Sequence, residues 1–290
     1  MIKKISLLLP TRGRAKLVER FFQSVIAQSA HPELIEVVLC VDDDDPESRG
    51  ISSSELALKM IVVPRQTMGA YNSICLQHAT GQITIAVNDD IVIRTKGWDD
   101  KVRALDARFP DGIYLGYGND LFKGEKVCTF PILSREACQV LAEPYPELYK
   151  GAFIDVHLMD IFRRLEKRGY PRMVYAEDIV FEHLHYRTNP DLLDATYWER
   201  ARFGDDTTFI ALSEARRCEA DRLLAHISGK SVHKVPELPK PTVEHGGFFA
   251  IVPLCLRTFL YDTDLPLTWR IYLFGYMIAR LYFSWFSKTP

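Results

Sequence analysis

The sequence predicts an α/β fold built on a mainly parallel sheet. Short runs rich in Ile, Val and Leu alternate with segments whose apolar residues recur at helical spacing. Most of these runs are followed directly by proline, aspartate or glycine. Strands joined through helices form right-handed β–α–β units, whose strands lie parallel. The length of 290 residues suffices for one large α/β domain with an added segment.

Six apolar runs are predicted to form strands, and five amphipathic segments are predicted to form helices. The strand predictions cover residues 5–9, 36–41, 60–63, 83–87, 113–117 and 173–185. Continuous apolar runs of this kind are typical of strands buried on both faces. The helix predictions cover residues 17–26, 71–79, 98–105, 155–168 and 208–227. Gly81, Gly169 and Gly229 follow three of these helices, where glycine readily takes the positive φ that ends a helix.

Composition narrows the possible functions. The chain has 36 Lys+Arg against 38 Asp+Glu, so it lacks the basic field of a nucleic-acid-binding protein. Its 6 cysteines have no regular spacing, which favours free thiols in a reducing compartment over a disulfide framework or zinc finger. The first apolar run, residues 5–9, is too short for a signal peptide, so we expect a cytoplasmic protein.

Acidic residues follow the strand predicted over residues 83–87, at the sheet edge where α/β proteins bind ligands. They belong to the sequence Asn88-Asp89-Asp90. Two carboxylates at the tip of a buried strand repel each other unless a cation compensates them. Mg²⁺ and Mn²⁺ are held by one or two carboxylates plus substrate oxygens. The pattern indicates a metal site; the alternative is a surface turn, in which Asn-Asp is common.

Two more polar segments follow strands. Residues 10–14 (PTRGR) come after the first strand, and residues 42–45 are four aspartates after the second. An acid at such a strand end can accept a hydrogen bond from a ribose hydroxyl or a base N–H. Asp42, nearest the strand, is the functional candidate. Most of the four aspartates are explained by a solvent-exposed acidic turn before Pro46.

Histidines and one helix-starting acid complete the candidate site. His183 and His185 are two residues apart on a predicted strand, so both imidazoles face the same side. Imidazole with carboxylate suits manganese, iron or zinc, and the spacing does not choose between them. Asp155 begins a predicted helix, either as an N-cap or as a general base at the edge of the site.

In this order the features resemble those of GT-A glycosyltransferases of the family 2 type, over roughly residues 4–200. Residues 6–14 (SLLLPTRGR) are similar to that family's opening strand and turn, and residues 41–43 (VDD) to its nucleotide-contacting acid. Residues 69–72 (GAYN) and 79–81 (ATG) resemble the G-x-x-x-N…A-x-G helix that precedes the family's metal-binding DxD strand.

The match departs from the family pattern at two places. Asn88 replaces the first acid of DxD, so the metal role falls first to Asp90 and then to Asp89. The second half resembles a subgroup with an acid-headed helix, then E-H-x-H at residues 182–185, then D-A-T-Y at residues 194–197. The usual Glu-Asp pair before the helix is absent, which leaves Asp160 as the second candidate for the base.

The resemblance implies a GT-A fold with a Rossmann-like, mainly parallel sheet and flanking helices. It implies inverting transfer of a sugar from a nucleotide-diphosphate sugar, with a UDP-sugar favoured, to an acceptor hydroxyl with Mn²⁺ or Mg²⁺ as cofactor. The implied metal ligands are Asp90, His183 and His185, and the implied general base is Asp155. Asp160 and Asp194 are possible secondary or acceptor-side residues. The implied donor contacts are Pro10, Thr11, Arg12, Arg14, Asp42, Asp43, Gly69, Asn72, Asn88 and Asp89.

The last part of the chain differs in character. The proline-rich residues 235–241 predict a boundary between a catalytic domain, residues 1–234, and a helical segment, residues 235–290. Residues 268–286 are densely aromatic and aliphatic but contain Arg270 and Arg280, and a central arginine costs about 2.5–3.5 kcal/mol in a spanning helix.

Such a segment suits the surface of an anionic membrane, and packing on the catalytic domain or on a second subunit is the alternative. Taken together with the family resemblance, binding of this segment to a membrane surface suggests a glycan or glycolipid acceptor, as in lipopolysaccharide or other cell-surface glycan synthesis. The protein would then act at the inner face of the cell membrane.

Three other functions stay open. A degenerate GT-A module that binds a glycan or scaffolds an assembly is favoured by Asn88 and by the missing acid before Asp155. The retained Asp90, Asp155 and the two histidines argue against that function. A nucleotidyltransferase would carry a Gly-rich loop with lysine where this chain has PTRGR. A zinc hydrolase would need an HExxH-type partner for the histidines.

Overall fold

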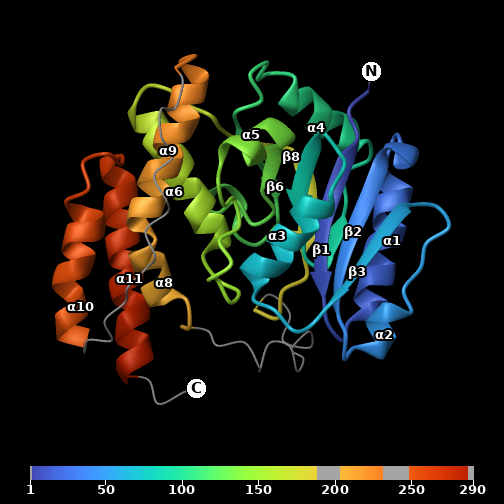
Figure 1. Cartoon of the computed structure of the whole chain (residues 1–290), viewed down its shortest axis with the longest axis horizontal. Coiled ribbons are helices and arrows are strands. Elements are labelled where there is room, and N and C mark those ends of the chain that lie inside the picture. The colour runs from blue at the N-terminus through green and yellow to red at the C-terminus, as the bar shows by residue number, and fades with distance from the viewer. Residues whose placement is uncertain (1, 188–202, 231–247, 287–290) are drawn as a thin grey trace.

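The computed structural model describes residues 2–187, 203–230 and 248–286 (Figure 1). Its strands are β1 (Ile5–Thr11), β2 (Ile35–Asp42), β3 (Ala57–Val63), β4 (Ile83–Ala86), β5 (Ile91–Ile93), β6 (Leu115–Asn119), β7 (Ile132–Ser134) and β8 (Met173–His183). The helices before residue 203 are α1 (Ala15–Gln28), α2 (Pro46–Arg49), α3 (Met68–His78), α4 (Trp98–Asp106), α5 (Arg135–Val140) and α6 (Ile154–Lys167). Those after it are α8 (Asp206–Ala211), α9 (Ser213–Ile227), α10 (Phe248–Cys255), a π-helical turn (Leu256–Leu260) and α11 (Leu267–Phe286).

Within the described residues, the strands form one 8-stranded sheet in the order β3-β2-β1-β4-β7-β6-β8-β5. β1 pairs in parallel with β2 on one side and with β4 on the other. The pairs β2–β3 and β6–β8 are also parallel, whereas β7 and β5 run antiparallel to their neighbours. The predicted mainly parallel α/β fold is confirmed. This order places the carboxyl ends of β2, β1 and β4 side by side.

Side chains of each strand alternate between two helical layers. Leu7 and Leu9 of β1 belong to one buried cluster together with residues of α1 and α4. Leu8 of β1 and Val38 of β2 belong to a second cluster, with residues of α3, α5 and α6. Both faces of the central strands are therefore covered, which explains their continuous apolar sequence. Figure 1 shows α1 on one side of the sheet and α6 on the other.

The helices after residue 203 extend the second cluster away from the sheet. In Figure 1, α10 and α11 form the outermost layer at that end, with α8 between α11 and the sheet domain. Residues of α11 at helical spacing are buried in the same cluster as α6: Trp269, Leu273, Met277 and Leu281. The predicted boundary, residues 235–241, lies outside the described residues. Helices from both sides of it share this one apolar cluster.

Pro10 lies within β1, opposite Cys40 of β2, and not in the turn after the strand as expected. The carbonyl of Leu8 accepts from the Val87 N–H at 3.0 Å. Backbone groups two residues apart face the same side, so the Pro10 nitrogen also faces β4. Pairing with β4 ends at Leu8, so the missing N–H of Pro10 interrupts no ladder.

Two helix ends differ from the predictions. The helix expected over residues 208–227 divides at Leu212 into α8 and α9, and the Phe209 carbonyl there accepts from Arg216 Nη1 at 2.7 Å. Gly81 does not end α3, because the helix stops at His78 and the φ of Gly81 is not positive. A Cβ on Gly81 would lie 2.6 Å from Ser6 Oγ, so this glycine permits close contact with β1.

Candidate active site

Side chains from the ends of β1, β2 and β4 lie together at one edge of the sheet. Thr11, the last residue of β1, donates from Oγ1 to Asp89 Oδ2 at 2.7 Å. Arg12 donates from Nη1 to Asp42 Oδ2 at 2.6 Å. Thr11, Asp42 and Asp89 are buried, while Arg12 and Asn88 are half-buried. The adjacency of parallel strand ends thus joins three segments that are distant in the sequence.

Asp89 and Asp90 are both buried, and the guanidinium of Arg14 lies close to both carboxylates. Arg14 Nη1 lies 2.9 Å from Asp89 Oδ1 and 3.8 Å from Asp90 Oδ2. Burial raises the pKa of Asp89 to about 6; Arg14 lowers this pKa, Asp90 raises it, and the hydrogen bond from Thr11 lowers it. The sequence predicted a divalent ion or a surface turn here; in the structure the Arg14 guanidinium supplies one positive charge beside the two acids.

His183 lies beside the second of these acids. His183 Nε2 is 3.3 Å from Asp90 Oδ1, and only 9% and 7% of the two side chains are exposed. The ring centroid of His185 is 5.1 Å from that of His183, so both imidazoles reach this region. His185 lies beyond the end of β8, however, and its ring stacks on Phe122 with the centroids 5.0 Å apart. His183 is therefore better placed beside Asp90.

The donor set at Asp90 and His183 fits a divalent ion that is completed by a substrate. Around an octahedral ion with ligands at 2.0–2.1 Å, neighbouring ligand atoms lie about 3 Å apart. The 3.3 Å separation between Asp90 Oδ1 and His183 Nε2 is close to that value. In the part of the chain that is described, no group of three or more His, Cys, Asp or Glu side chains could hold a metal. Phosphate oxygens of a substrate and water would supply the remaining ligands.

Arg12 connects β1 to the acids after β2. Besides Asp42, its guanidinium contacts Asp44, and Tyr71 of α3 donates a hydrogen bond from its hydroxyl to Asp42 Oδ1. Hydrogen bonds from Arg12 lower the pKa of Asp44. Asp43, a predicted donor contact, and Asp44 are both exposed, but it is Asp44 that pairs with Arg12 as its second acid.

Sequence reasoning missed Asp44 and Tyr71. The sequence offers no way to choose among four consecutive aspartates, because the choice depends on which carboxylate the turn presents to Arg12. Tyr71 lies inside the GAYN segment, and its position one residue before Asn72 was the signal available.

α3 lies at the same edge of the sheet and is fixed by close backbone contacts. A Cβ on Gly69 would be 1.9 Å from the Pro146 carbonyl oxygen, so only glycine fits at this contact. The Gly69 N–H donates to the Tyr149 carbonyl at 2.9 Å. Asn72 is buried one residue beyond Tyr71. Gly69 thus positions α3, whereas Tyr71 projects its hydroxyl to Asp42.

Asp155 lies in the first turn of α6 and is half-buried. The N-cap is Phe153, not Asp155, and Phe153 has a left-handed φ of 67°. Asp155 Oδ1 accepts from the Val156 N–H at 2.8 Å. The Phe153 ring stacks on Phe209 of α8 at 4.6 Å and lies under the Arg280 guanidinium of α11 at 4.8 Å. Later helices therefore fix the strained residue that precedes this candidate base.

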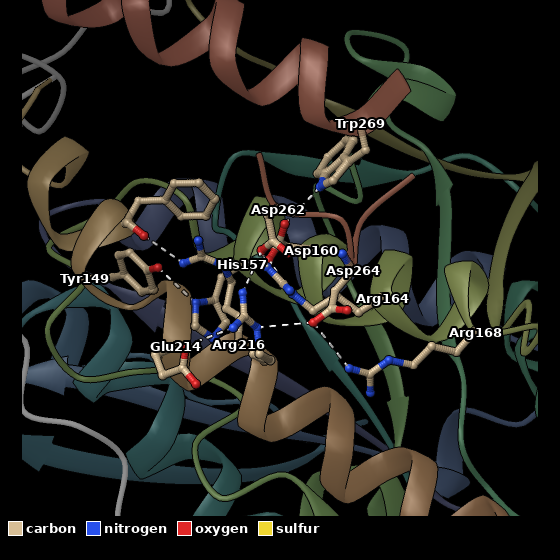
Figure 2. Close-up of polar contacts among 12 residues, drawn as sticks. Tyr149, His157, Asp160, Arg164, Arg168, Glu214, Arg216, Asp262, Asp264 and Trp269 are labelled. Atoms are coloured by element: carbon tan, nitrogen blue, oxygen red, sulfur yellow. Dashed lines mark hydrogen bonds and ion pairs between the residues drawn. The ribbon is translucent and has the colours of Figure 1, made fainter. Parts of the chain in front are cut away.

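Asp160, the second candidate base, is fully buried in a network that joins α6, α9 and α11 (Figure 2). Asp160 Oδ1 accepts from Trp269 Nε1 at 3.0 Å, and Oδ2 accepts from Arg216 Nε at 2.8 Å and Arg164 Nε at 3.2 Å. Burial raises the pKa of Asp160, but Arg164 and Arg216 outweigh it and the net shift is downward. Asp160 therefore has a structural role as the acceptor for these three side chains. Asp194 lies outside the described residues.

Solved structures of other proteins share this architecture. No family model and no curated protein matches the chain. The mannosyltransferase PcManGT from Pyrobaculum calidifontis, solved with GDP-Man and Mn²⁺, is 15% identical, with 100% of this chain and 89% of that chain covered at a TM-score of 0.53. S. aureus TarS 1–349, solved with UDP-GlcNAc, is 16% identical, with 96% and 88% covered at a TM-score of 0.53. The chain therefore has the GT-A glycosyltransferase fold.

Proposed function

We propose that the protein is a metal-dependent glycosyltransferase that moves a sugar from a nucleotide-diphosphate sugar, with a UDP-sugar favoured, to an acceptor hydroxyl. The observation that carries this proposal is the convergence of Thr11, Arg12, Asp42, Asp89 and Asp90 at one sheet edge. The GT-A fold and its likeness to structures that hold GDP-Man or UDP-GlcNAc support it.

The residues divide into a nucleotide-binding group and a metal-binding group. Thr11, Arg12, Asp42 and Tyr71 would bind the nucleoside, while Arg14 would face the diphosphate. Asp90 and His183 would hold Mn²⁺ or Mg²⁺, which when bound neutralises the charge of the departing diphosphate.

Asp155 would take the proton of the acceptor hydroxyl as that oxygen attacks the anomeric carbon opposite the leaving group. Attack from that side inverts the configuration.

A thermal-unfolding panel of nucleoside diphosphates and nucleotide sugars, with and without Mn²⁺, tests this function. A ligand at 100 times its Kd adds about 2.7 kcal/mol of stability, so we expect one nucleoside diphosphate to raise Tm only when Mn²⁺ is present. In Asp90→Asn the Mn²⁺-dependent part should disappear. Asp178→Asn, which changes an exposed acid on β8, should respond like the native protein. No response of the folded native protein to any nucleotide would favour the glycan-binding module instead.

We further propose a glycolipid acceptor, reached by peripheral contact of the C-terminal helices with the inner face of the cell membrane. None of the described helices has the length and apolarity needed to cross a bilayer. The exposed face of α11 carries large apolar side chains: Leu267, Ile271, Tyr272, Tyr282 and Phe283. Arg280 turns inward and donates to Asp206 of α8 at 2.7 Å. The sequence has no acid after Asp264, so an apolar face without negative charge suits an anionic lipid surface.

Replacing Tyr282 and Phe283 together with serine is expected to weaken binding to vesicles of phosphatidylcholine and phosphatidylglycerol at least tenfold. Burying each ring contributes more than about 1.5 kcal/mol, which exceeds the ~1.4 kcal/mol of a tenfold change. Vesicle co-sedimentation measures the effect, with Val62→Ser as control because Val62 is an exposed apolar residue on β3. Equal sedimentation of both variants, or no binding by the native protein, would contradict this contact.

A further inference from the structure

The Arg14 side chain occupies the space beside both acids of the candidate site. Only 9% of its side chain is exposed. Its backbone is fixed as the N-cap of α1, because the Arg14 carbonyl accepts from the N–H groups of Leu17 at 2.9 Å and Val18 at 3.2 Å. Nη1 faces Asp89 Oδ1 and Asp90 Oδ2, whereas His183 faces the other oxygen of Asp90. Asp90 is thus flanked by the guanidinium on one side and the imidazole on the other.

The charges at this site favour joint binding of a cation and an anion. With both carboxylates ionised, the buried Asp89 and Asp90 together with Arg14 carry a net charge of −1. A divalent ion on Asp90 and His183 would raise that net charge to +1 and would lie near the guanidinium, which repels it. A diphosphate brings two or more negative charges and accepts N–H donors from arginine. Its arrival would offset the repulsion.

We propose that Arg14 makes metal binding depend on the nucleoside diphosphate. Without nucleotide, Arg14 is the counter-cation of Asp89 and Asp90 and competes with the divalent ion. With nucleotide, its guanidinium turns toward the diphosphate and leaves Asp90 to the metal. This inference rests on the proposed function. Because coupling between two ligands is reciprocal, Mn²⁺ must strengthen nucleotide binding by the same factor.

Electron paramagnetic resonance of free Mn²⁺ tests the inference without measuring catalysis. Mn²⁺ is titrated into the full-length protein alone, with UDP and with GDP. We expect the native protein to bind Mn²⁺ at least about tenfold more tightly with one of these nucleotides, a change of ~1.4 kcal/mol. Arg14→Met should bind Mn²⁺ alone at least tenfold more tightly than the native protein. Its further gain from nucleotide should shrink.

Matched variants separate this effect from a general loss of positive charge. Arg49→Met removes an arginine from an exposed position at the end of α2 and should leave Mn²⁺ binding unchanged. Arg14→Lys keeps the charge and should retain most of the coupling, and it serves as the main test if Arg14→Met does not fold. The inference is overturned if Arg14→Met binds Mn²⁺ alone no more tightly than Arg49→Met, or if Arg14→Lys loses the coupling. Failure of the native protein to bind either nucleotide would instead overturn the proposed function.

Discussion

Asp155→Asn is expected to slow sugar transfer by about 10²–10⁴-fold, the usual contribution of a general base, while nucleotide binding is retained. Asparagine keeps an oxygen that can accept the Val156 N–H, so the start of α6 should be preserved. It cannot take up the acceptor proton. The measurement is the initial rate of nucleoside diphosphate release from the donor that stabilises the protein, with a lipid extract as the source of acceptor.

The matched control for this experiment is Glu166→Gln. Glu166 also lies on α6, and 40% of its side chain is exposed in a pair with Arg163. This variant should transfer sugar at the native rate. If Asp155→Asn transferred at the native rate as well, another group would have to be the base. Loss of nucleotide binding in Asp155→Asn would assign Asp155 to the donor site instead.

Asp160→Asn is expected to reduce the free energy of unfolding by about 3–5 kcal/mol, because removing one partner of a buried ion pair leaves an uncompensated charge. Asp160 is 0% exposed and accepts from Arg164, Arg216 and Trp269 (Figure 2). Arg164 keeps a second carboxylate acceptor, Asp262 Oδ2 at 2.7 Å, whereas Arg216 keeps the neutral Phe209 carbonyl at 2.7 Å. Urea unfolding followed by circular dichroism measures the loss.

Asp178→Asn provides the comparison for stability. Asp178 forms an exposed ion pair with Lys101, with 67% and 42% of the two side chains accessible. Exposed pairs of this kind contribute about 0–1 kcal/mol, so this variant should unfold close to the native midpoint. Similar losses in both variants would show that the buried network is not a major source of stability, and Asp160 would return as a candidate for the base.

The sequence by itself predicted the sheet and the place of the site. Continuous apolar runs such as those in β1 and β2 are typical of strands that are buried on both faces. They therefore predict a parallel sheet with helices packed on both sides. Parallel strands end at one edge, so Thr11, Asp42 and Asp89 were predicted to lie near one another without any contact information. His183 was predicted beside them from strand alternation and from the family resemblance. These inferences depend on local pattern and on chain direction.

Only the tertiary structure decided which charges pair. Four consecutive aspartates are equivalent in sequence, and the fold selects Asp42 and Asp44 as the partners of Arg12. Periodicity cannot show that Arg14 supplies a cation to Asp89, nor that Asp160 pairs with arginines. Arg280, which makes α11 unsuitable as a spanning helix, contacts Asp206 from a helix 74 residues away in the chain. Such contacts depend on how separate elements pack, because a buried charge is stable only where the fold places its partner.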